Sequence, residues 1–191
     1  MKMSMIEKAF VNSPRHSVRV SSHAEEMLRM IAFAPGQKYL DMGCGNGAAP
    51  IKLARAYDLD VTGIDVDPAQ IQAAEKVSAG IANIHFATLD GTVLPFDDSK
   101  FNIVATNKVM HHIPHWEQAW AEMVRILKPG GSLLFNDLVY PNWLAAIGRT
   151  LAKSWAGFPT LVAIETLIGS NNLRLIHRSM SPLHYEAVLQ K

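Results

Sequence analysis

Short apolar strands alternate with amphipathic helices through the middle of this 191-residue chain, and this alternation limits the folds it can adopt. Strand-like segments lie at 38–43, 60–65, 83–88, 101–107 and 132–138, and helix-like segments lie at 48–57, 68–80 and 115–128. Strands that alternate with helices favour a parallel sheet covered by helices on both faces. The sequence therefore predicts a doubly wound α/β fold.

The end of the chain departs from this rhythm. Two helices are predicted within 141–169, and two strands at 173–180 and 184–190 are joined by three residues, Ser181–Leu183. So short a connection makes a hairpin, so the last strand should run antiparallel to its neighbours.

A chain of 191 residues has room for one domain of ordinary size. We expect a single domain over 1–191, with an N-terminal helix at 21–33 capped by Ser22, an α/β core at 38–138, a helical segment at 141–169 and a C-terminal hairpin at 173–190.

Composition narrows the classes of partner. Lys and Arg number 18 against 17 Asp and Glu, so no strong electrostatic attraction to nucleic acid is expected. One cysteine, Cys44, cannot form an intrachain disulfide or a cysteine-based metal site. The sequence contains no apolar run of about 18 residues, so no transmembrane helix is expected. We expect a cytoplasmic monomer or homodimer that binds a small molecule, with no metal and no nucleic acid.

A glycine-rich turn follows the first strand in the sequence YLDMGCGNG, residues 39–47. Glycines there let the chain turn sharply and let a ligand approach the backbone. The dinucleotide fingerprint is G-x-G-x-x-G, whereas the third glycine here comes one residue early. Asp41 would also repel a pyrophosphate and attract a cation. S-adenosylmethionine carries an ammonium and a sulfonium and no phosphate, so these charges favour it as the ligand.

Asp65 ends the second strand, 24 residues after Asp41. A carboxylate there can accept hydrogen bonds from both ribose hydroxyls of a nucleoside. Nicotinamide and adenosylmethionine enzymes both use this feature, so it indicates a nucleoside without choosing between them. Helix capping is the structural alternative for Asp65, and capping is the favoured role of Asp67, which precedes Pro68.

Five segments together resemble one known family: YLDMGCGNG, VTGIDVDP, FATLDGTVLPFDDSKFNIV, VMHHIP and RILKPGGSLLF. Their order and spacing over 38–138 are similar to class I S-adenosylmethionine-dependent methyltransferases, most of all the ubiquinone/menaquinone biosynthesis type. The resemblance implies a Rossmann-like seven-stranded sheet, mostly parallel with one antiparallel strand, in agreement with the expected hairpin. It also implies S-adenosylmethionine as methyl donor and S-adenosylhomocysteine as product.

The resemblance further implies a role for each cofactor-binding residue. These are Asp41, Gly43 and Gly45 beside the methionine and ribose, Asp65 at the ribose, Val66 on the adenine face, Asp90 at the adenine amino group, Gly91 at a ring nitrogen through its N–H, and Asn107 near the methionine.

Methyl transfer from a sulfonium chiefly requires alignment and exclusion of water, and needs a base only if the acceptor must lose a proton. His111, His112 and His115 follow the fourth strand, at the edge where open α/β sheets bind ligands. We take His112 as the first candidate base and His111 as the second. Packing and backbone hydrogen bonding are the alternative roles of these histidines.

The segment 141–169 is the part expected to specify the acceptor, a small and apolar or aromatic molecule. Its apolar residues recur at helical spacing: Trp143, Ile147, Leu151, Trp155, Phe158 and Val162. They can pack on the sheet, cover the acceptor as a lid, or contact a membrane surface. Near the N-terminus, Arg15, His16 and Arg19 can pair with the ligand carboxylate, pair with an acidic acceptor, or remain solvated.

Two other function classes stay open. A nicotinamide-dependent oxidoreductase would also need a glycine turn and Asp65, although the early third glycine and Asp41 count against it. A non-catalytic S-adenosylmethionine-binding module that regulates a partner would share every cofactor residue.

Overall fold

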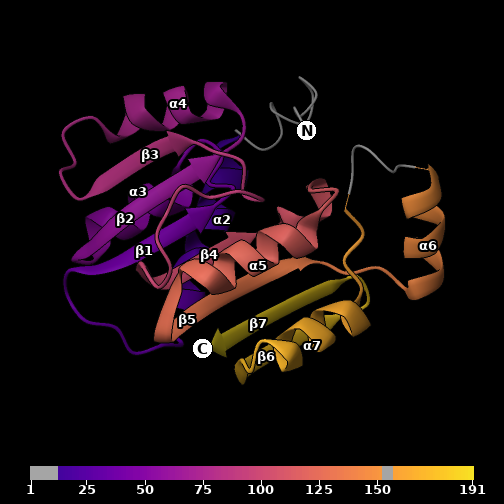
Figure 1. Cartoon of the computed structure of the whole chain (residues 1–191). Helices are drawn as coiled ribbons and strands as arrows, with labels where there is room; N and C mark the ends of the chain where they lie inside the picture. The colour runs from indigo at the N-terminus through magenta and orange to yellow at the C-terminus, as the bar shows by residue number, and fades with distance from the viewer. Residues whose placement is uncertain (1–12, 152–156) are drawn as a thin grey trace.

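The computed structural model describes residues 13–151 and 157–191, which form one seven-stranded sheet in the order β3–β2–β1–β4–β5–β7–β6 (Figure 1). The strands are β1 (Gln37–Met42), β2 (Leu59–Asp65), β3 (Ile84–Thr88), β4 (Phe101–Asn107), β5 (Leu127–Leu138), β6 (Arg174–Ser181) and β7 (His184–Gln190). Strands β1 to β5 pair in parallel, and β7 runs antiparallel to both β5 and β6. The predicted fold class is confirmed, including its single antiparallel strand.

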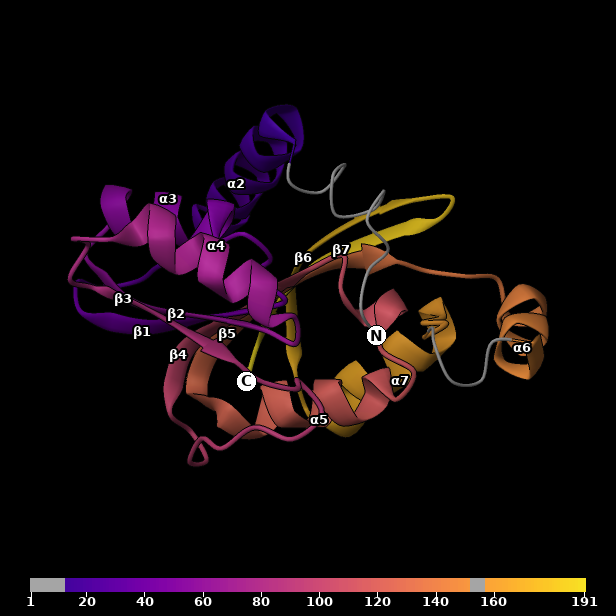
Figure 2. The ribbon, with the colours of Figure 1, turned by 90° about the horizontal axis from the view of Figure 1, so that it is seen from above.

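Helices cover both faces of the sheet. One face carries α2 (Pro14–Leu28), α3 (Ala48–Ala56) and α4 (Pro68–Ser78), and the other carries α5 (Trp116–Ile126) and α7 (Leu161–Ser170) (Figure 2). A single 3₁₀ turn, η1 (Met110–His112), follows β4. This arrangement follows from parallel strands, whose connections must cross over the sheet through a helix.

The amphipathic helix predicted at 115–128 is the clearest link from sequence to packing, because its apolar residues recur every three or four positions. Trp116, Trp120, Met123 and Leu127 are at most 1% exposed and belong to the core beneath α5. Burying a large side chain of this kind contributes about 2–3 kcal/mol by area. A second core lies on the opposite face, between the sheet and helices α2 and α3.

The expected N-terminal helix at 21–33 is wrong in its bounds, because α2 begins seven residues earlier and ends at Leu28. Ser13, not Ser22, is the N-cap: its side chain accepts a hydrogen bond from the His16 N–H, and Pro14 occupies the first helical turn. Proline at this position lacks an N–H that the helix could not pair anyway. The polar first turns of α2 carry no strong apolar periodicity, which is why the pattern alone placed the helix too late.

The apolar stripe of 141–169 does not pack on the sheet as a whole. On α6 (Asn142–Leu151), Trp143 is 66% exposed, Ile147 50% and Leu151 80%, although Ala145 is buried. Helix α6 lies apart from the sheet in both views (Figures 1 and 2). Plain core packing is therefore wrong for this part of the stripe. Trp155 lies outside the described residues.

The strand order reverses beside β1, which pairs with β2 on one side and β4 on the other. In an open parallel sheet such a reversal leaves a crevice at the carboxyl ends of the strands, because the two connections leave in opposite directions. None of the helices within 13–151 and 157–191 is both long and apolar enough to cross a bilayer.

Candidate active site

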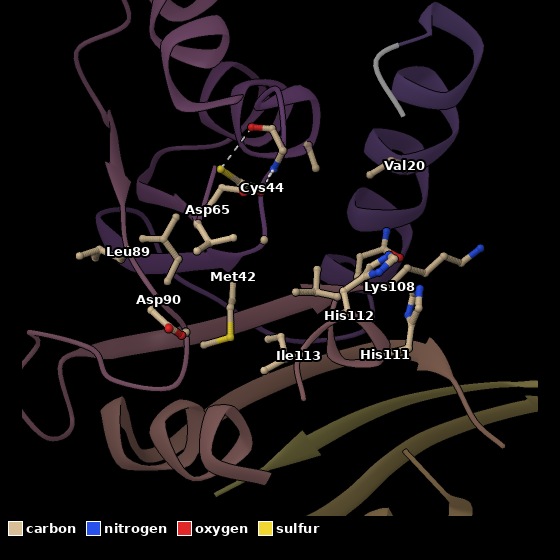
Figure 3. A pocket seen from close by; sticks show the side chains of 18 of the residues that line it. Val20, Met42, Cys44, Asp65, Leu89, Asp90, Lys108, His111, His112 and Ile113 are labelled. Atoms are coloured by element: carbon tan, nitrogen blue, oxygen red, sulfur yellow. Dashed lines mark hydrogen bonds between the residues drawn. The ribbon is translucent and has the colours of Figure 1, made fainter. Parts of the chain in front are cut away.

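A cavity of about 760 Å³ opens at the carboxyl ends of β1, β2 and β4 (Figure 3). Nine of the ten candidate residues line it: Gly43, Gly45, Asp65, Val66, Asp90, Gly91, Asn107, His111 and His112. His115 also lines it, and α2 contributes His16, Ser17 and Val20. The crevice expected from the strand order is therefore a real cavity, and it is large enough for a nucleoside together with a second small molecule.

The glycine turn between β1 and α3 forms one wall. Gly43 and Gly45 have φ angles of +79° and +53°, which residues other than glycine rarely adopt. A Cβ on Gly43 would lie 2.2 Å from Cγ2 of Val109, whereas a Cβ on Gly45 would meet no atom within 4 Å. Gly43 therefore satisfies a packing requirement, and Gly45 leaves open space beside the cavity.

Asp65 fixes this turn from the end of β2. Its Oδ2 accepts a hydrogen bond from the Gly45 N–H at 2.9 Å, and its Oδ1 accepts one from the Asp67 N–H at 2.9 Å. Burial raises the pKa of Asp65, and these two hydrogen bonds partly oppose that rise. A carboxylate has about four acceptor positions, so Asp65 keeps capacity for ligand hydroxyls.

Asp67 does not share this role. Its side chain accepts from the Ala69 N–H and caps α4, while only 4% of the residue is exposed. The capping interpretation of Asp67 is confirmed.

Asp41 is the one candidate that does not line the main cavity. It is 6% exposed and borders a separate cavity of about 40 Å³ behind the glycine turn, together with Gly43 and Asn107. Burial, and then the nearby Asp65 charge, raise the pKa of Asp41 to about 7. A bound cation would oppose this rise by stabilising the ionised form.

The loop after β3 provides the next part of the wall. Asp90 is exposed, and its Oδ1 accepts hydrogen bonds from the Thr92 N–H at 2.9 Å and the Thr92 hydroxyl at 2.8 Å. These two bonds, the backbone one first, lower the pKa of Asp90 and keep it ionised. Val66 is 49% exposed at the same end of the cavity, and Gly91 is buried against Met42.

The histidines occupy the other end, on and after η1. Nδ1 of His111 lies 2.6 Å from Oδ1 of Asp137, a fully buried carboxylate at the end of β5. Asp137 also accepts from the backbone N–H groups of Val109, Met110 and Leu138 at 2.6–2.8 Å. The His112 ring lies 4.0 Å from the His111 ring, and His115 is exposed.

Sequence reasoning missed Asp137. The available signal was an acid in SLLFNDL, at the carboxyl end of the strand next to β4. Its contact with His111 joins residues 26 positions apart and depends on the pairing of β4 with β5. Sequence reasoning also left Lys108 unassigned, although it lines the cavity between Asn107 and Val109.

Residues 40–135 match a known protein family described as a methyltransferase domain. Two curated relatives are each 31% identical to this chain: 27-O-demethylrifamycin SV methyltransferase of Amycolatopsis mediterranei, over 74% of this chain, and 2-methyl-6-phytyl-1,4-hydroquinone methyltransferase of Synechocystis, over 69%. The chain spans about half the length of these relatives, 54% and 43% respectively.

Solved structures have the same fold. Geranyl diphosphate C-methyltransferase from Streptomyces coelicolor A3(2), in complex with Mg²⁺, geranyl diphosphate and S-adenosylhomocysteine, superposes with a TM-score of 0.73. The alignment covers 94% of this chain and 86% of that chain at 14% identity. The TM-score supports a common fold. Because the identity is so low, the acceptor must be argued from the residues of this chain.

Proposed function

Because this chain belongs to the class I S-adenosylmethionine-dependent methyltransferases, we propose that it transfers a methyl group to a small molecule bound in the 760 Å³ cavity. The observation that carries this proposal is that a single cavity joins Asp65 and the open side of Gly45 to the His111–Asp137 pair. One end fits a nucleoside without phosphate, and the other offers a proton acceptor.

At the first end, Asp65 holds the ribose hydroxyls with its remaining acceptor positions. Val66 packs on the adenine, Asp90 accepts from the adenine amino group, and the Gly91 N–H donates to a ring nitrogen. Gly43, Gly45 and Asn107 lie along the methionine portion, with Asp41 behind them as a countercharge. The open space at Gly45 and the ionised Asp90 support this fit.

When bound, the cofactor supplies a methyl group activated by its sulfonium. The chain holds the acceptor in line with that group and excludes water. Because Asp137 is buried and accepts from Nδ1–H of His111, Nε2 of His111 is left as the proton acceptor. We therefore place His111 ahead of His112 as the general base, reversing the order expected from sequence.

The acceptor has an apolar or aromatic body. Ile113 and Pro114, which follow η1, line the cavity, as do Leu138 at the end of β5 and Val20 of α2. One curated relative is named for a phytyl hydroquinone, an aromatic molecule with an apolar chain.

The cofactor is tested by isothermal titration of S-adenosylhomocysteine against the wild-type chain and Asp65→Ala. We expect micromolar binding by the wild type and a loss of at least about tenfold in the variant, since a charged hydrogen-bond acceptor disappears. Asp67→Ala is the matched control, because the Asp67 side chain caps α4 and is not among the residues that line the cavity. Equal or tighter binding of NAD by the wild type would overturn the proposal.

The base is tested by incubating the chain with radiolabelled S-adenosylmethionine and fractionated small-molecule extracts. Steady-state kinetics are then measured with the acceptor that becomes labelled. We expect His111→Gln to lower kcat by about 10²–10⁴-fold with little change in KM. His112→Gln and the exposed His115→Gln serve as comparisons. An unchanged kcat in His111→Gln would eliminate the base, and the absence of any labelled product would favour a non-catalytic binding module.

A further inference from the structure

The two ends of the cavity differ in charge. Among the described residues that line it, the acids are Asp65 and Asp90, both at the glycine-turn end. Lys108 is the one lysine or arginine that the described part of the chain contributes to the lining, and it lies at the histidine end (Figure 3). Within residues 13–151 and 157–191, the histidine end therefore has a lysine and no lining carboxylate.

Lys108 has an unusual backbone at the end of β4. Its φ angle is +57°, a conformation that favours glycine and asparagine over lysine, and its N–H donates to the Asn136 carbonyl at 2.7 Å. The residue is half-buried, yet its ammonium makes no hydrogen bond or ion pair with any residue of the described chain. Residues with such backbone angles persist only where the surrounding structure holds them in place, and they cluster at functional sites.

The acids closest to this end are already engaged. Asp137 accepts from three backbone N–H groups and from His111. Glu186 of β7 lies 2.8 Å from Nε2 of His23 and 3.7 Å from Nε2 of His177. Neither carboxylate pairs with the Lys108 ammonium.

The positive charge of Lys108 contributes to the lowered pKa of two neighbouring imidazoles. The pKa of His16 is lowered by burial first, and then by Arg19 and Lys108. The pKa of His184 is likewise lowered by burial first and then by Lys108, with Glu186 and Asp137 opposing the change. Of these residues, Lys108 and His16 line the cavity itself, one from the loop after β4 and the other from α2.

We propose that the methyl acceptor carries an anionic group, a carboxylate or a phosphate, which the Lys108 ammonium binds. This inference rests on the proposed methyl transfer and adds a substrate class to it: an apolar or aromatic acid. The apolar body of the acceptor packs on Ile113 and Leu138, and the accepting atom faces His111, three residues from Lys108 in the chain. The glycine-turn end of the cavity, which holds Asp65 and Asp90, would repel the same anion. The charges therefore also determine the orientation in which the acceptor binds.

The experiment uses the wild-type chain saturated with S-adenosylhomocysteine. Benzoate and phenyl phosphate are titrated by calorimetry, with benzamide and phenol as their neutral counterparts. We expect each anion to bind about tenfold more tightly than its counterpart, and this preference to shrink as salt is added. Binding by both anions, or by one, identifies which charged group the cavity accepts.

Lys108→Met removes the ammonium and leaves an unbranched, flexible side chain that is one heavy atom shorter, at the same positive φ angle. We expect it to weaken anion binding by about tenfold, leave the neutral compounds unchanged and keep affinity for S-adenosylhomocysteine within about twofold. Lys108→Arg should retain the preference. Lys76→Met, at an exposed site in the last turn of α4, is the control for net charge.

Three results overturn the inference. The first is anion binding no tighter than neutral binding, and the second is an unchanged preference in Lys108→Met. The third is an equal loss of S-adenosylhomocysteine affinity in Lys108→Met, which would assign the ammonium to the cofactor carboxylate. Failure of the proposed function is distinct, because the wild type would then not bind S-adenosylhomocysteine at all.

Discussion

Asp41 carries the largest electrostatic conflict at the residue scale. Burial and the neighbouring Asp65 raise its pKa to about 7. Between its unfolded and folded pKa, the ligand-free folded protein therefore keeps a proton on Asp41 that the unfolded chain has lost. The folded state binds more protons than the unfolded state between about pH 4 and pH 7. The penalty of burying Asp41 therefore grows as pH rises through this window and is complete above it.

Asp41→Asn should accordingly stabilise the ligand-free protein at pH 8 by about 1–3 kcal/mol and have little effect at pH 4. It should also weaken binding of the cationic cofactor, because the countercharge is lost. Urea denaturation at the two pH values measures the first effect, and titration of S-adenosylmethionine measures the second. Asp58→Asn, at an exposed position, is the control. Parallel stability curves for wild type and Asp41→Asn across this pH range would contradict the argument.

The glycines of the turn separate folding from binding. Gly43→Ala puts a Cβ 2.2 Å from Cγ2 of Val109 at a φ of +79°, so we expect a loss of about 2–4 kcal/mol in unfolding free energy. Gly45→Ala meets no protein atom and should lose about 1 kcal/mol from backbone strain alone. Calorimetry should nevertheless find S-adenosylhomocysteine binding impaired in Gly45→Ala. Unimpaired binding there would mean that the cofactor does not approach Gly45.

At the scale of elements, α5 and α6 have similar apolar periodicity and different environments. Trp120 of α5 is fully buried and lies edge-on to Phe135, with ring centroids 5.3 Å apart. Trp143 of α6 is 66% exposed. Helical spacing predicts an apolar face in both helices, and the sheet covers that face in α5.

This difference predicts unequal costs for losing a tryptophan. Trp120→Ala should lower the unfolding free energy by about 3–5 kcal/mol, since it empties a packed core site. Trp143→Gln should change it by no more than about 0.5 kcal/mol, as expected for an exposed position. Chemical denaturation of both variants gives the comparison. A large loss in Trp143→Gln would show that α6 packs against the rest of the chain in solution.

At the scale of the whole molecule, the cavity wall is assembled from distant parts of the chain. His16 comes from α2, Asp65 from β2, Asn107 from β4 and Leu138 from β5. A ligand that contacts all these elements binds the folded state and not the unfolded one. Ligand binding should therefore stabilise the entire fold.

S-adenosylhomocysteine at about 100 times its Kd should add about 2.7 kcal/mol to the unfolding free energy. For a chain of this size that corresponds to a rise of about 5–10 °C in Tm. Differential scanning calorimetry measures the shift, and the same concentration of NAD should leave Tm unchanged. Asp65→Ala should lose at least about half of the shift, because a tenfold weaker Kd leaves about 1.4 kcal/mol at the same ligand concentration. A full shift in that variant would remove Asp65 from the cofactor site.

The sequence by itself determined the fold class and the position of the cofactor end of the site. Strand and helix periodicity, the glycine turn and Asp65 are local in the chain, and local patterns report backbone conformation directly. The roles of the cofactor residues remain predictions, although Gly43, Gly45 and Asp65 do line one cavity.

Tertiary structure decided what depends on distant residues meeting. The His111–Asp137 pair spans 26 residues and exists because β4 and β5 are neighbours in the sheet. Three further features likewise depend on which element covers which side chain. They are the position of Asp41 behind the turn, the exposed face of α6, and the Lys108 ammonium, which has no partner among residues 13–151 and 157–191. Periodicity identifies an apolar or charged face, and only the packed chain decides what that face contacts.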